Sequence, residues 1–496
     1  MQSVFDHGAA AHCPAPFNMA AYVLSKAVEL GDKPALEILG GSGEVITFAQ
    51  LHARVSRVAG GLLASGLQAG DHVLLRLGNT PDFPVAYLAC IWGGLVPIPA
   101  SAQLTVPEAT EIARQTRPAV ILHQEGVSLP EFDAPVLTEL PQADAVPPVM
   151  GDPNRLAYIV FTSGTSGRPS GVCHAHRAIW ARRMMWEGWY GLGQDDRMMH
   201  AGAFNWTYTL GTGLMDPWSI GATALIPDND VTSAELAGLI SQNSVSIFAA
   251  APGVYRQMLK HDLPDMPRLR HGLSAGESLP PSLRLAWRAA SGTDLHEAMG
   301  MSECSTFISG NPKTPAHSTS CGRPQRGRRI AVLQDGKPVP HDTAGLLAIH
   351  RSDPGLMLGY LGEEPEQGEW FITSDTVSMS KDGDITYLGR RDDMMNAGGY
   401  RVSPLEVEAA FSGVAHLTGC AAASVEIKAD TRVIALFYTS SAPLDEEALR
   451  ACAQALLARY KQPRLYIHLD TLPKGGNGKL NRRLLRDRFE ASHDQT

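Results

Sequence analysis

Strand-like and helix-like patterns alternate along residues 20–125, and this alternation constrains the fold more than any other feature of the sequence. Apolar residues recur at helical spacing in Leu51–Leu67, and the next apolar run, Asp71–Leu77, has the length of a buried strand. A helix at Pro84–Trp92 and a strand at Leu95–Ile98 continue the series. Strands that alternate with helices form parallel sheets with helices on both faces, so we expect an α/β fold.

The same pattern resumes further along the chain and then gives way to shorter elements. Further strands are expected at Ala119–His123, Ala157–Thr162, Ala222–Ile226, Val245–Ala250 and Leu269–Ser274. Short strands joined by turns then predict a β-rich lobe, and a small α+β unit follows Asp393. Because 496 residues are too many for one ordinary core, we expect two or three domains, and the patterns divide the chain into two. The N-terminal domain covers residues 1–391, including the β-rich lobe at about 325–391, and a mobile C-terminal domain covers residues 392–496.

Composition excludes several classes of protein. A net charge of -9 argues against a nucleic-acid-binding protein, which needs a basic face. The seven cysteines are scattered singly, so neither a disulfide framework nor a zinc site is indicated. The first residues lack the pattern of a signal peptide, and the longest apolar stretch, Tyr87–Ala100, is too short to span a bilayer. We therefore expect a cytoplasmic protein that binds neither nucleic acid nor membrane.

A run rich in glycine and hydroxyl residues, FTSGTSGRPSGV at 161–172, follows one of the expected strands. We expect a helix to begin near His174, which would place the run at a strand-to-helix turn. Glycines let the backbone approach a ligand, and free N–H groups at such a turn suit phosphate oxygens. The run is not a Walker loop, because no Gly-Lys-Ser/Thr closes it. In isolation it is more typical of a flexible surface loop, so its interpretation depends on other segments.

Distant segments accompany this run in a fixed order. They are GMSE at Gly300–Glu303, Ser374–Asp375, GRRDD at Gly389–Asp393, GGYRVSPLEVE at Gly398–Glu408 and PKGGNGKL at Pro473–Leu480. Together with the glycine-rich run, they resemble the adenylate-forming superfamily, which includes acyl-CoA synthetases, firefly luciferase and the adenylation domains of peptide synthetases. The likeness runs from about Ala35 to about Arg486. It is specific as a set, whereas each motif alone is weak.

The resemblance implies two half-reactions. A carboxylate attacks the α-phosphate of ATP to give an acyl-adenylate and pyrophosphate, and a thiol, usually that of coenzyme A, then displaces AMP. ATP, Mg²⁺ and coenzyme A are the implied cofactors, and a small carboxylic acid is the implied substrate. Such an in-line attack requires close positioning and neutralisation of phosphate charge, and little covalent help from the protein.

The resemblance also assigns residues to the nucleotide. The β- and γ-phosphates are expected to contact Thr162, Ser163, Gly164, Thr165, Ser166 and Gly167. Ala275, Gly276 and Glu277 would pack on adenine, and Glu297 would meet its amino group. Asp375 would accept both ribose hydroxyls, a role that suits an ionised carboxylate, and Arg390 would bind ribose or phosphate.

Three catalytic residues follow from the same likeness. Ser302 would contact the α-phosphate, and Glu303 would bind Mg²⁺ through hard carboxylate oxygens. Lys479 would bridge the substrate carboxylate and the α-phosphate as a point cation. Members of the superfamily usually carry lysine where this chain has Ser170, and Arg168 nearby can supply a charge.

The C-terminal motifs imply a movement between the two half-reactions. Asp392 matches the hinge, and Gly399 and Arg401 match a strand presented to the thiol tunnel after the small domain rotates. Glycine at that point leaves room for a pantetheine arm. Each orientation of the small domain would then serve one half-reaction.

The stretch Phe204–Gly213 falls where the superfamily places the helix that lines the acyl pocket, and it resembles the benzoate-type CoA ligases. The expected pocket residues are Phe204, Asn205, Trp206, Thr207, Tyr208 and Met301. No Asp or Glu lies in this stretch, so an ammonium group has no partner there and we expect an apolar acid. Met301 stands where a tryptophan shrinks acetate pockets, so the acid should be larger than acetate. The alternative is that these aromatic residues belong to the core.

Three functions remain open at the level of sequence. The first is an acid–CoA ligase, and the second is an adenylating enzyme that loads a separate carrier protein. The third is an inactive nucleotide-binding scaffold, which the presence of Glu303, Asp375 and Lys479 disfavours. A homodimer is also left open.

Overall fold

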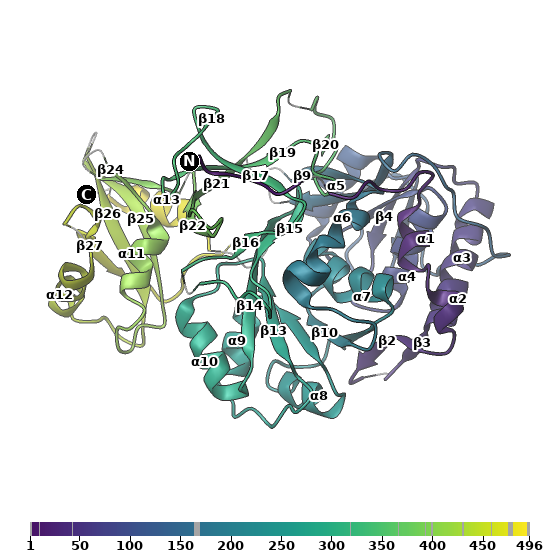
Figure 1. Cartoon of the computed structure of the whole chain (residues 1–496), viewed down its shortest axis with the longest axis horizontal. Coiled ribbons are helices and arrows are strands. Elements are labelled where there is room, and N and C mark those ends of the chain that lie inside the picture. Colours follow the sequence, from purple (N-terminus) through teal and green to yellow (C-terminus); the bar gives the residue numbers. More distant parts are fainter. Residues whose placement is uncertain are drawn as a thin grey trace. The chain divides into compact units, whose positions relative to one another are not determined.

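The computed structural model describes residues 2–493 except positions 9, 42, 163–168, 318, 366, 392, 398–399, 429–430, 458 and 475–479. The chain forms two compact units (Figure 1). The larger unit comprises Phe5–Arg329 and His350–Phe371, and the smaller unit comprises Met1–Val4, Ile330–Ile349 and Ile372–Thr496. The boundary predicted at residues 391–392 lies inside the smaller unit, so a division into domains at that point stays a prediction.

A nine-stranded sheet dominates the larger unit. Its strands are β2 (Pro34–Leu39), β3 (Val45–Thr47), β10 (Arg197–Ala201), β11 (Thr223–Pro227), β12 (Ile247–Ala250), β13 (His271–Ala275), β14 (Asp294–Met301), β15 (Ser305–Ser309) and β16 (Arg323–Pro324). All neighbours in the row β14-β13-β12-β10-β11-β2 pair in parallel. Because parallel strands end at one edge of a sheet, residues that follow β10, β12, β13 and β14 are brought together there.

A second, four-stranded sheet in the larger unit is parallel throughout and has the order β5-β4-β6-β7. Its strands and the helices near them are β4 (His72–Arg76), β5 (Val96–Pro99), β6 (Val120–His123), β7 (Val136–Leu137), α3 (Phe48–Ala64), α4 (Asp82–Trp92) and α5 (Val106–Thr116). Thr47 and Gln50 form a capping box at the start of α3, and buried Leu51, Val55 and Leu62 repeat at helical spacing along it. The alternation of helices and strands predicted for this region is confirmed.

The glycine-rich run falls between two antiparallel strands, which corrects one prediction. β8 (Leu156–Thr162) pairs antiparallel with β9 (Ser170–Ala175), and β20 (Gly359–Tyr360) pairs with the other side of β9. The helix predicted to begin near His174 is therefore wrong, because His174 lies in β9 and the next helix, α6 (Ala178–Arg182), begins at Ala178. Pairing on both sides satisfies the backbone groups of β9 and decides in favour of a strand.

The remaining helical elements of the larger unit are short. They are α1 (Met19–Val23), α2 (Ala27–Leu30), η1 (Trp186–Tyr190), η2 (Thr209–Met215), α7 (Asp216–Ile220), α8 (Leu236–Gln242), α9 (Pro252–Met258) and α10 (Pro281–Ser291). In Figure 1, α10 lies against β14 and α9. The elements η1 and η2 are π-helical turns, a rare conformation that is frequent at functional sites. Trp189, Trp218 and Trp287 fill the core.

The smaller unit contains the predicted β-rich lobe and α+β region. Its elements are β1 (Val4–Asp6), β17 (Arg329–Gln334), β18 (Lys337–Pro338), β19 (Gly345–His350), β21 (Trp370–Met379), β22 (Ile385–Arg390), β23 (Met395–Ala397), β24 (Tyr400–Val402), β25 (Gly419–Lys428), β26 (Thr431–Thr439), β27 (Leu465–His468), α11 (Pro404–Ala410), α12 (Glu446–Leu456), η3 (Arg459–Lys461) and α13 (Arg482–His493). The first six form one sheet, β23 pairs β24, and β25-β26-β27 form a third sheet. The expected fold class, α/β with a β-rich lobe and a small α+β region, is thus confirmed.

Candidate active site

Ser302 and Glu303 lie in a tight turn between β14 and β15. Met301 pairs with Ser305, and Ser305 adopts a positive φ of 59° to close the turn. A Cβ on Gly300 would overlap the backbone of Ser305, so only glycine fits there. The turn follows the carboxyl end of the parallel strand β14, where ligands of α/β sheets bind.

Hydrogen bonds from two neighbouring strands and a loop hold this turn. His174 Nε2 donates to the Ser302 carbonyl at 2.7 Å. Tyr360 Oη donates to Glu303 Oε1 at 2.7 Å, and the Met357 N–H donates to the Glu303 carbonyl at 2.8 Å. His174 is on β9 and Tyr360 on β20, the strands next to the glycine-rich run. One small sheet therefore flanks the expected phosphate loop and also positions the expected magnesium ligand.

The protonation of His174 follows from its surroundings. Burial lowers the pKa of His174 to about 4, although the bond to the Ser302 carbonyl opposes this shift. The ring is neutral near pH 7 and carries its single proton on Nε2, because a carbonyl can only accept. Nδ1 is left as an acceptor.

Several predicted residues lie outside the described part of the chain. These are Ser163, Gly164, Thr165, Ser166 and Gly167 of the loop, and also Asp392, Gly399 and Lys479. Their roles stay predictions. Thr162 ends β8 and pairs with Ser170 across the hairpin, and the backbone of Arg401 belongs to β24.

The expected adenine segment begins at the same sheet edge. Ala275 is the last residue of β13, and Gly276 has a φ of 94°, which favours glycine. Glu277 follows it. Glu297, on β14, pairs with Ser274 and is buried.

Glu297 has protein partners of its own. Its carboxylate accepts the Leu279 N–H at 2.9 Å and lies 3.1 Å from Arg284 Nη2. Burial raises the pKa of Glu297 to about 7, against these two partners. These contacts tie the segment after β13 to β14, and a role toward adenine stays a prediction.

In the smaller unit, Asp375 and Arg390 face each other across a strand pair. They are register partners on β21 and β22. Tyr387 Oη donates to Asp375 Oδ1 at 3.3 Å, and Arg390 Nη2 donates to Ser374 Oγ at 2.5 Å. The two residues are neighbours in the backbone register, and their roles toward ribose and phosphate stay predictions.

Of the expected acyl-pocket residues, Thr207 lines a cavity in the larger unit. Phe204 is buried in the core against Phe83, and the Tyr208 ring packs on Trp189 and His200. Asn205, Trp206 and Met301 are partly buried and do not line the cavity. The cavity is lined by Tyr87, Tyr158, His174, Ala178, Ala181, Arg182, Thr207, Leu210, Met215, Ser302, Cys304, Ser305, Arg328 and Gly355. Most of these residues carry no local sequence signal, because they come from segments far apart in the chain.

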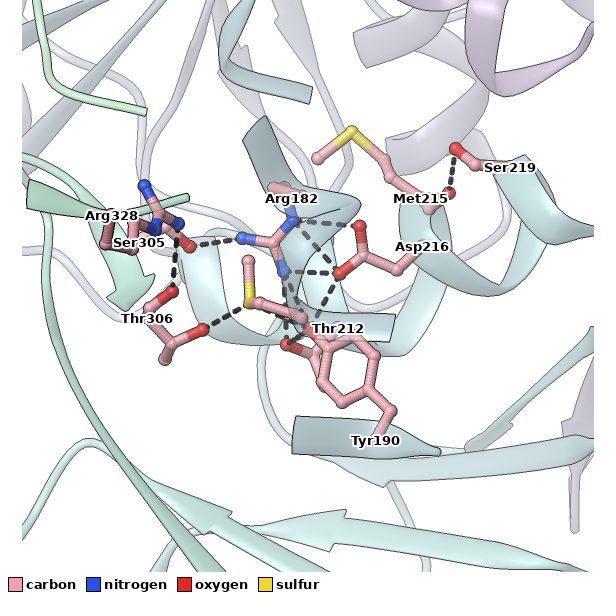
Figure 2. A network of polar contacts seen from close by, with 10 residues as sticks. Arg182, Tyr190, Thr212, Met215, Asp216, Ser219, Ser305, Thr306 and Arg328 are labelled. Atoms are coloured by element: carbon pink, nitrogen blue, oxygen red, sulfur yellow. Dashed lines mark hydrogen bonds and ion pairs between the residues drawn. The ribbon is translucent and has the colours of Figure 1, made fainter. Parts of the chain in front are cut away.

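A buried ionic network borders this cavity (Figure 2). Arg182 donates to Asp216 through Nη2 at 2.6 Å and through Nε at 3.0 Å, and its Nη1 donates to Ser305 Oγ. Tyr190 Oη donates to Asp216 at 2.7 Å. Burial acts to lower the pKa of Arg182, but the charge of Asp216 outweighs it and raises the pKa, whereas burial raises the pKa of Asp216 against its bonds to Arg182 and Tyr190. A Cβ on Gly211 would collide with this guanidinium.

The next point is which side chains of the described residues could bind a metal ion. They include no group of three or more His, Cys, Asp or Glu side chains placed to hold a metal ion. Glu303 is a single carboxylate, oriented by Tyr360. This fits Mg²⁺, which is commonly bound by one or two carboxylates together with substrate phosphates. Among the described helices, none combines the length and the apolar character needed to cross a membrane.

Residues 24–361 match the model of the AMP-binding enzyme family, and the chain therefore belongs to that family. It is 29% identical to a benzoate–CoA ligase of Thauera aromatica, over 98% of this chain and 99% of that protein. Its fold is similar to the crystal structure of a benzoate CoA ligase from Burkholderia xenovorans LB400, at 25% identity and a TM-score of 0.84 over 95% of this chain and 100% of that one. It is also similar to an anthranilate CoA ligase in complex with anthranoyl-AMP, at 24% identity and a TM-score of 0.87 over 97% of this chain and 99% of that one.

Proposed function

We propose that the protein is an AMP-forming acid–CoA ligase that acts on an aromatic or medium-chain carboxylic acid. The observation that carries the proposal is the Ser302–Glu303 turn at the carboxyl end of β14, held by His174 and Tyr360. Full-length similarity to benzoate–CoA ligases supports the same reaction. An inactive scaffold has no need for a carboxylate oriented in this way.

The first half-reaction forms an acyl-adenylate. A carboxylate oxygen of the acid attacks the α-phosphorus of ATP, and the bond to the bridging oxygen breaks to release pyrophosphate. Ser302 and Lys479 contact the oxygens that gain charge, and the residues of the 162–167 run hold the β- and γ-phosphates. Glu303 would hold Mg²⁺, which would supply neutralisation of phosphate charge. Ala275–Glu277, Glu297, Asp375 and Arg390 hold the nucleoside.

The second half-reaction forms the thioester. The thiol sulfur of coenzyme A attacks the acyl carbon, AMP leaves with the electron pair of the broken bond, and the thiol proton is released. Asp392 is the hinge at which a C-terminal domain, residues 392–496, rotates. Gly399 and Arg401 then face the pantetheine arm. Two orientations let one pocket serve two reactions.

A panel of acids tests this function. Purified protein is mixed with MgATP and benzoate, ring-substituted benzoates, phenylacetate, hexanoate, acetate or amino acids, and pyrophosphate is measured with and without coenzyme A. We expect turnover of an aromatic or medium-chain acid that rises sharply when coenzyme A is present, and loss of turnover in Glu303→Gln. Pyrophosphate release that coenzyme A does not stimulate would favour a carrier protein as acceptor. Release with no acid at all would contradict the proposal.

A further inference from the structure

Arg182 connects two segments that the proposed reaction has to keep in register. Its Nη1 atom donates to Ser305 Oγ, on the first residue of β15 and just after the Ser302–Glu303 turn. Its Nη2 atom donates to Thr212 Oγ1 at 3.2 Å (Figure 2). The guanidinium also packs on Gly211, where a Cβ would lie 2.2 Å from its central carbon. Because residues 211 and 212 belong to the expected acyl-pocket stretch, one buried side chain joins that stretch to the turn.

The guanidinium of Arg182 is fully engaged with protein acceptors. Its Nε and Nη2 atoms donate to Asp216 at 3.0 Å and 2.6 Å, and Tyr190 Oη donates to the same carboxylate at 2.7 Å. The side chains of Arg182 and Asp216 are 7% and 1% exposed. Since each of the three nitrogens already donates to a protein group, Arg182 is placed to hold its surroundings and not to bind the carboxylate of the acid.

Ser305 needs to be held, because its backbone conformation is strained. Its φ of 59° lies in the left-handed region, which residues other than glycine adopt at a cost in free energy. Such residues persist where several contacts fix them, and they cluster at active sites. Ser305 is fixed by the bond from Arg182 and by its pairing with Met301 across the turn. The bond from Arg182 therefore stabilises the conformation that closes the Ser302–Glu303 turn.

A second buried arginine holds the next residue of β15. Arg328 Nη2 donates to the Thr306 carbonyl at 3.3 Å, and Arg328 Nη1 pairs with Asp353 Oδ1 at 2.6 Å. The side chains of Arg328 and Asp353 are at most 1% exposed. Replacing a buried ion pair with apolar residues of similar volume is often neutral or stabilising. Two such pairs at adjacent residues of one strand therefore indicate a need for fixed geometry more than a need for stability.

We propose that Arg182 is a positioning residue that sets the place of the Ser302–Glu303 turn relative to the acyl-pocket stretch. This inference rests on the proposed function, in which the turn acts at the phosphates while the acid lies along that stretch. A displacement of about 1 Å between reacting groups can slow a reaction about 100-fold. Arg182 contacts neither ATP nor the acid, and it acts on the rate by holding the two sides of the site together.

Two substitutions of Ser305 separate the bond from the backbone conformation. Ser305→Ala and Ser305→Gly both remove the acceptor of Arg182 Nη1 and leave the pair of Arg182 with Asp216 intact. Glycine adopts a positive φ without strain, whereas alanine does not. We expect both variants to lower kcat for acid-dependent pyrophosphate release by about 10- to 100-fold, with nearly unchanged KM values for ATP and the acid.

Ser309→Ala is the matched control on the same strand. Ser309 is buried, and its hydroxyl donates to the Gly188 carbonyl at 2.8 Å and accepts from Gln325 Nε2 at 3.1 Å. We expect its kcat to equal that of wild type. Hydrogen–deuterium exchange of residues 300–308 provides a second measurement that needs no turnover. Exchange should be faster than in wild type in both Ser305 variants and should be unchanged in Ser309→Ala.

An apolar replacement of the ion pair separates positioning from stability. The double variant Arg182→Met/Asp216→Leu leaves no charge buried without its partner, so we expect it to fold and to unfold in urea near the wild-type midpoint. It no longer donates to Ser305 Oγ. Its kcat for pyrophosphate release should therefore be as low as that of Ser305→Ala.

The outcomes distinguish this inference from the function on which it rests. If Ser305→Gly or the double variant releases pyrophosphate at the wild-type rate, the inference is overturned while the ligase function stands. A change in KM for the acid without a change in kcat would show that Arg182 binds substrate, and this also overturns it. If wild type releases no pyrophosphate with any acid, the proposed function fails. Unchanged exchange of residues 300–308 in the Ser305 variants overturns the inference separately.

Discussion

The two units differ in how deeply their most buried ion pairs lie. In the larger unit the ion pairs Arg182–Asp216 and Arg328–Asp353 are at most 7% exposed, and five histidines are buried. Among the described residues of the smaller unit, the pair Arg482–Glu408 is 14% exposed, and the pairs Arg450–Glu446 and Arg432–Glu426 are more than 40% exposed. Separating a buried ion pair costs much free energy, so such a pair favours one arrangement of its side chains. Separating an exposed ion pair costs little. The pairs Arg182–Asp216 and Arg328–Asp353 therefore suit a fixed pocket.

The strongest test of this contrast removes one cation from each unit. Arg182→Met leaves the buried Asp216 carboxylate without its cation, and we expect the free energy of unfolding to fall by about 3–5 kcal/mol. Arg450→Met removes one partner of an exposed pair and should change it by about 0.5 kcal/mol or less. Urea unfolding followed by circular dichroism measures both. The double variant Arg182→Met/Asp216→Leu should recover much of the loss, and equal effects of the two single changes would remove the contrast.

Lys479→Ala tests the role assigned to the C-terminal part. This lysine is expected to act only in adenylation, so the rate of acid-dependent pyrophosphate release should fall by about two to three orders of magnitude. Thioester formation from a supplied acyl-adenylate should be nearly unchanged. Lys474→Ala, an exposed lysine at the start of the same segment, is the control and should behave like wild type. An equal loss in both half-reactions would show that Lys479 has a different role.

The prediction with the smallest expected effect concerns the burial of a single side chain in the larger unit, His200. Burial lowers the pKa of His200 to about 3, and neither ring nitrogen has a hydrogen-bond partner among the described residues. Below the unfolded pKa of about 6.5 the unfolded chain binds a proton that the folded chain does not. The stability contribution of this histidine is therefore complete above pH 6.5 and is lost as the pH falls toward 3.

His200→Leu removes this titration. We expect it to be neutral or stabilising at pH 7, since no hydrogen bond is lost. Its advantage over wild type should grow by about 1.4 kcal/mol for each pH unit below 6.5. Denaturant unfolding between pH 7 and pH 4.5 measures this difference. Parallel profiles for the two proteins would show that the folded protein protonates His200.

The sequence predicts most of the regular structure because the relevant patterns are local. The helix at Asp82–Trp92 and the strand at Val120–His123 follow from apolar runs of the right length. The helix predicted near His174 is wrong for a tertiary reason, because β9 becomes a strand through pairing with β8 and β20.

The site is predictable only where a motif carries it. Ser302 and Glu303 lie in one short segment, so their closeness to each other follows from the sequence, while their roles stay predictions. The pairing of Arg182 with Asp216 joins residues 34 positions apart, on α6 and α7. The sequence of neither helix predicts this pairing. The same is true of Tyr360 beside Glu303, which are 57 positions apart. Polar groups that meet only through packing leave no local signal in a sequence.

A Cβ at Gly211 would collide with the Arg182 guanidinium. Substitutions at positions 182, 211 and 216 therefore depend on one another during evolution. A side chain at position 211 requires a smaller residue at position 182. Loss of Arg182 alone leaves the buried Asp216 carboxylate without its cation. Loss of Asp216 alone leaves the buried Arg182 guanidinium without its carboxylate partner. No first step among the three is neutral, so a lineage that reshapes this wall of the pocket has to change the residues together. Libraries for new acid specificities would reach more of the accessible sequences by varying residues 182, 211 and 216 jointly than by varying each in turn.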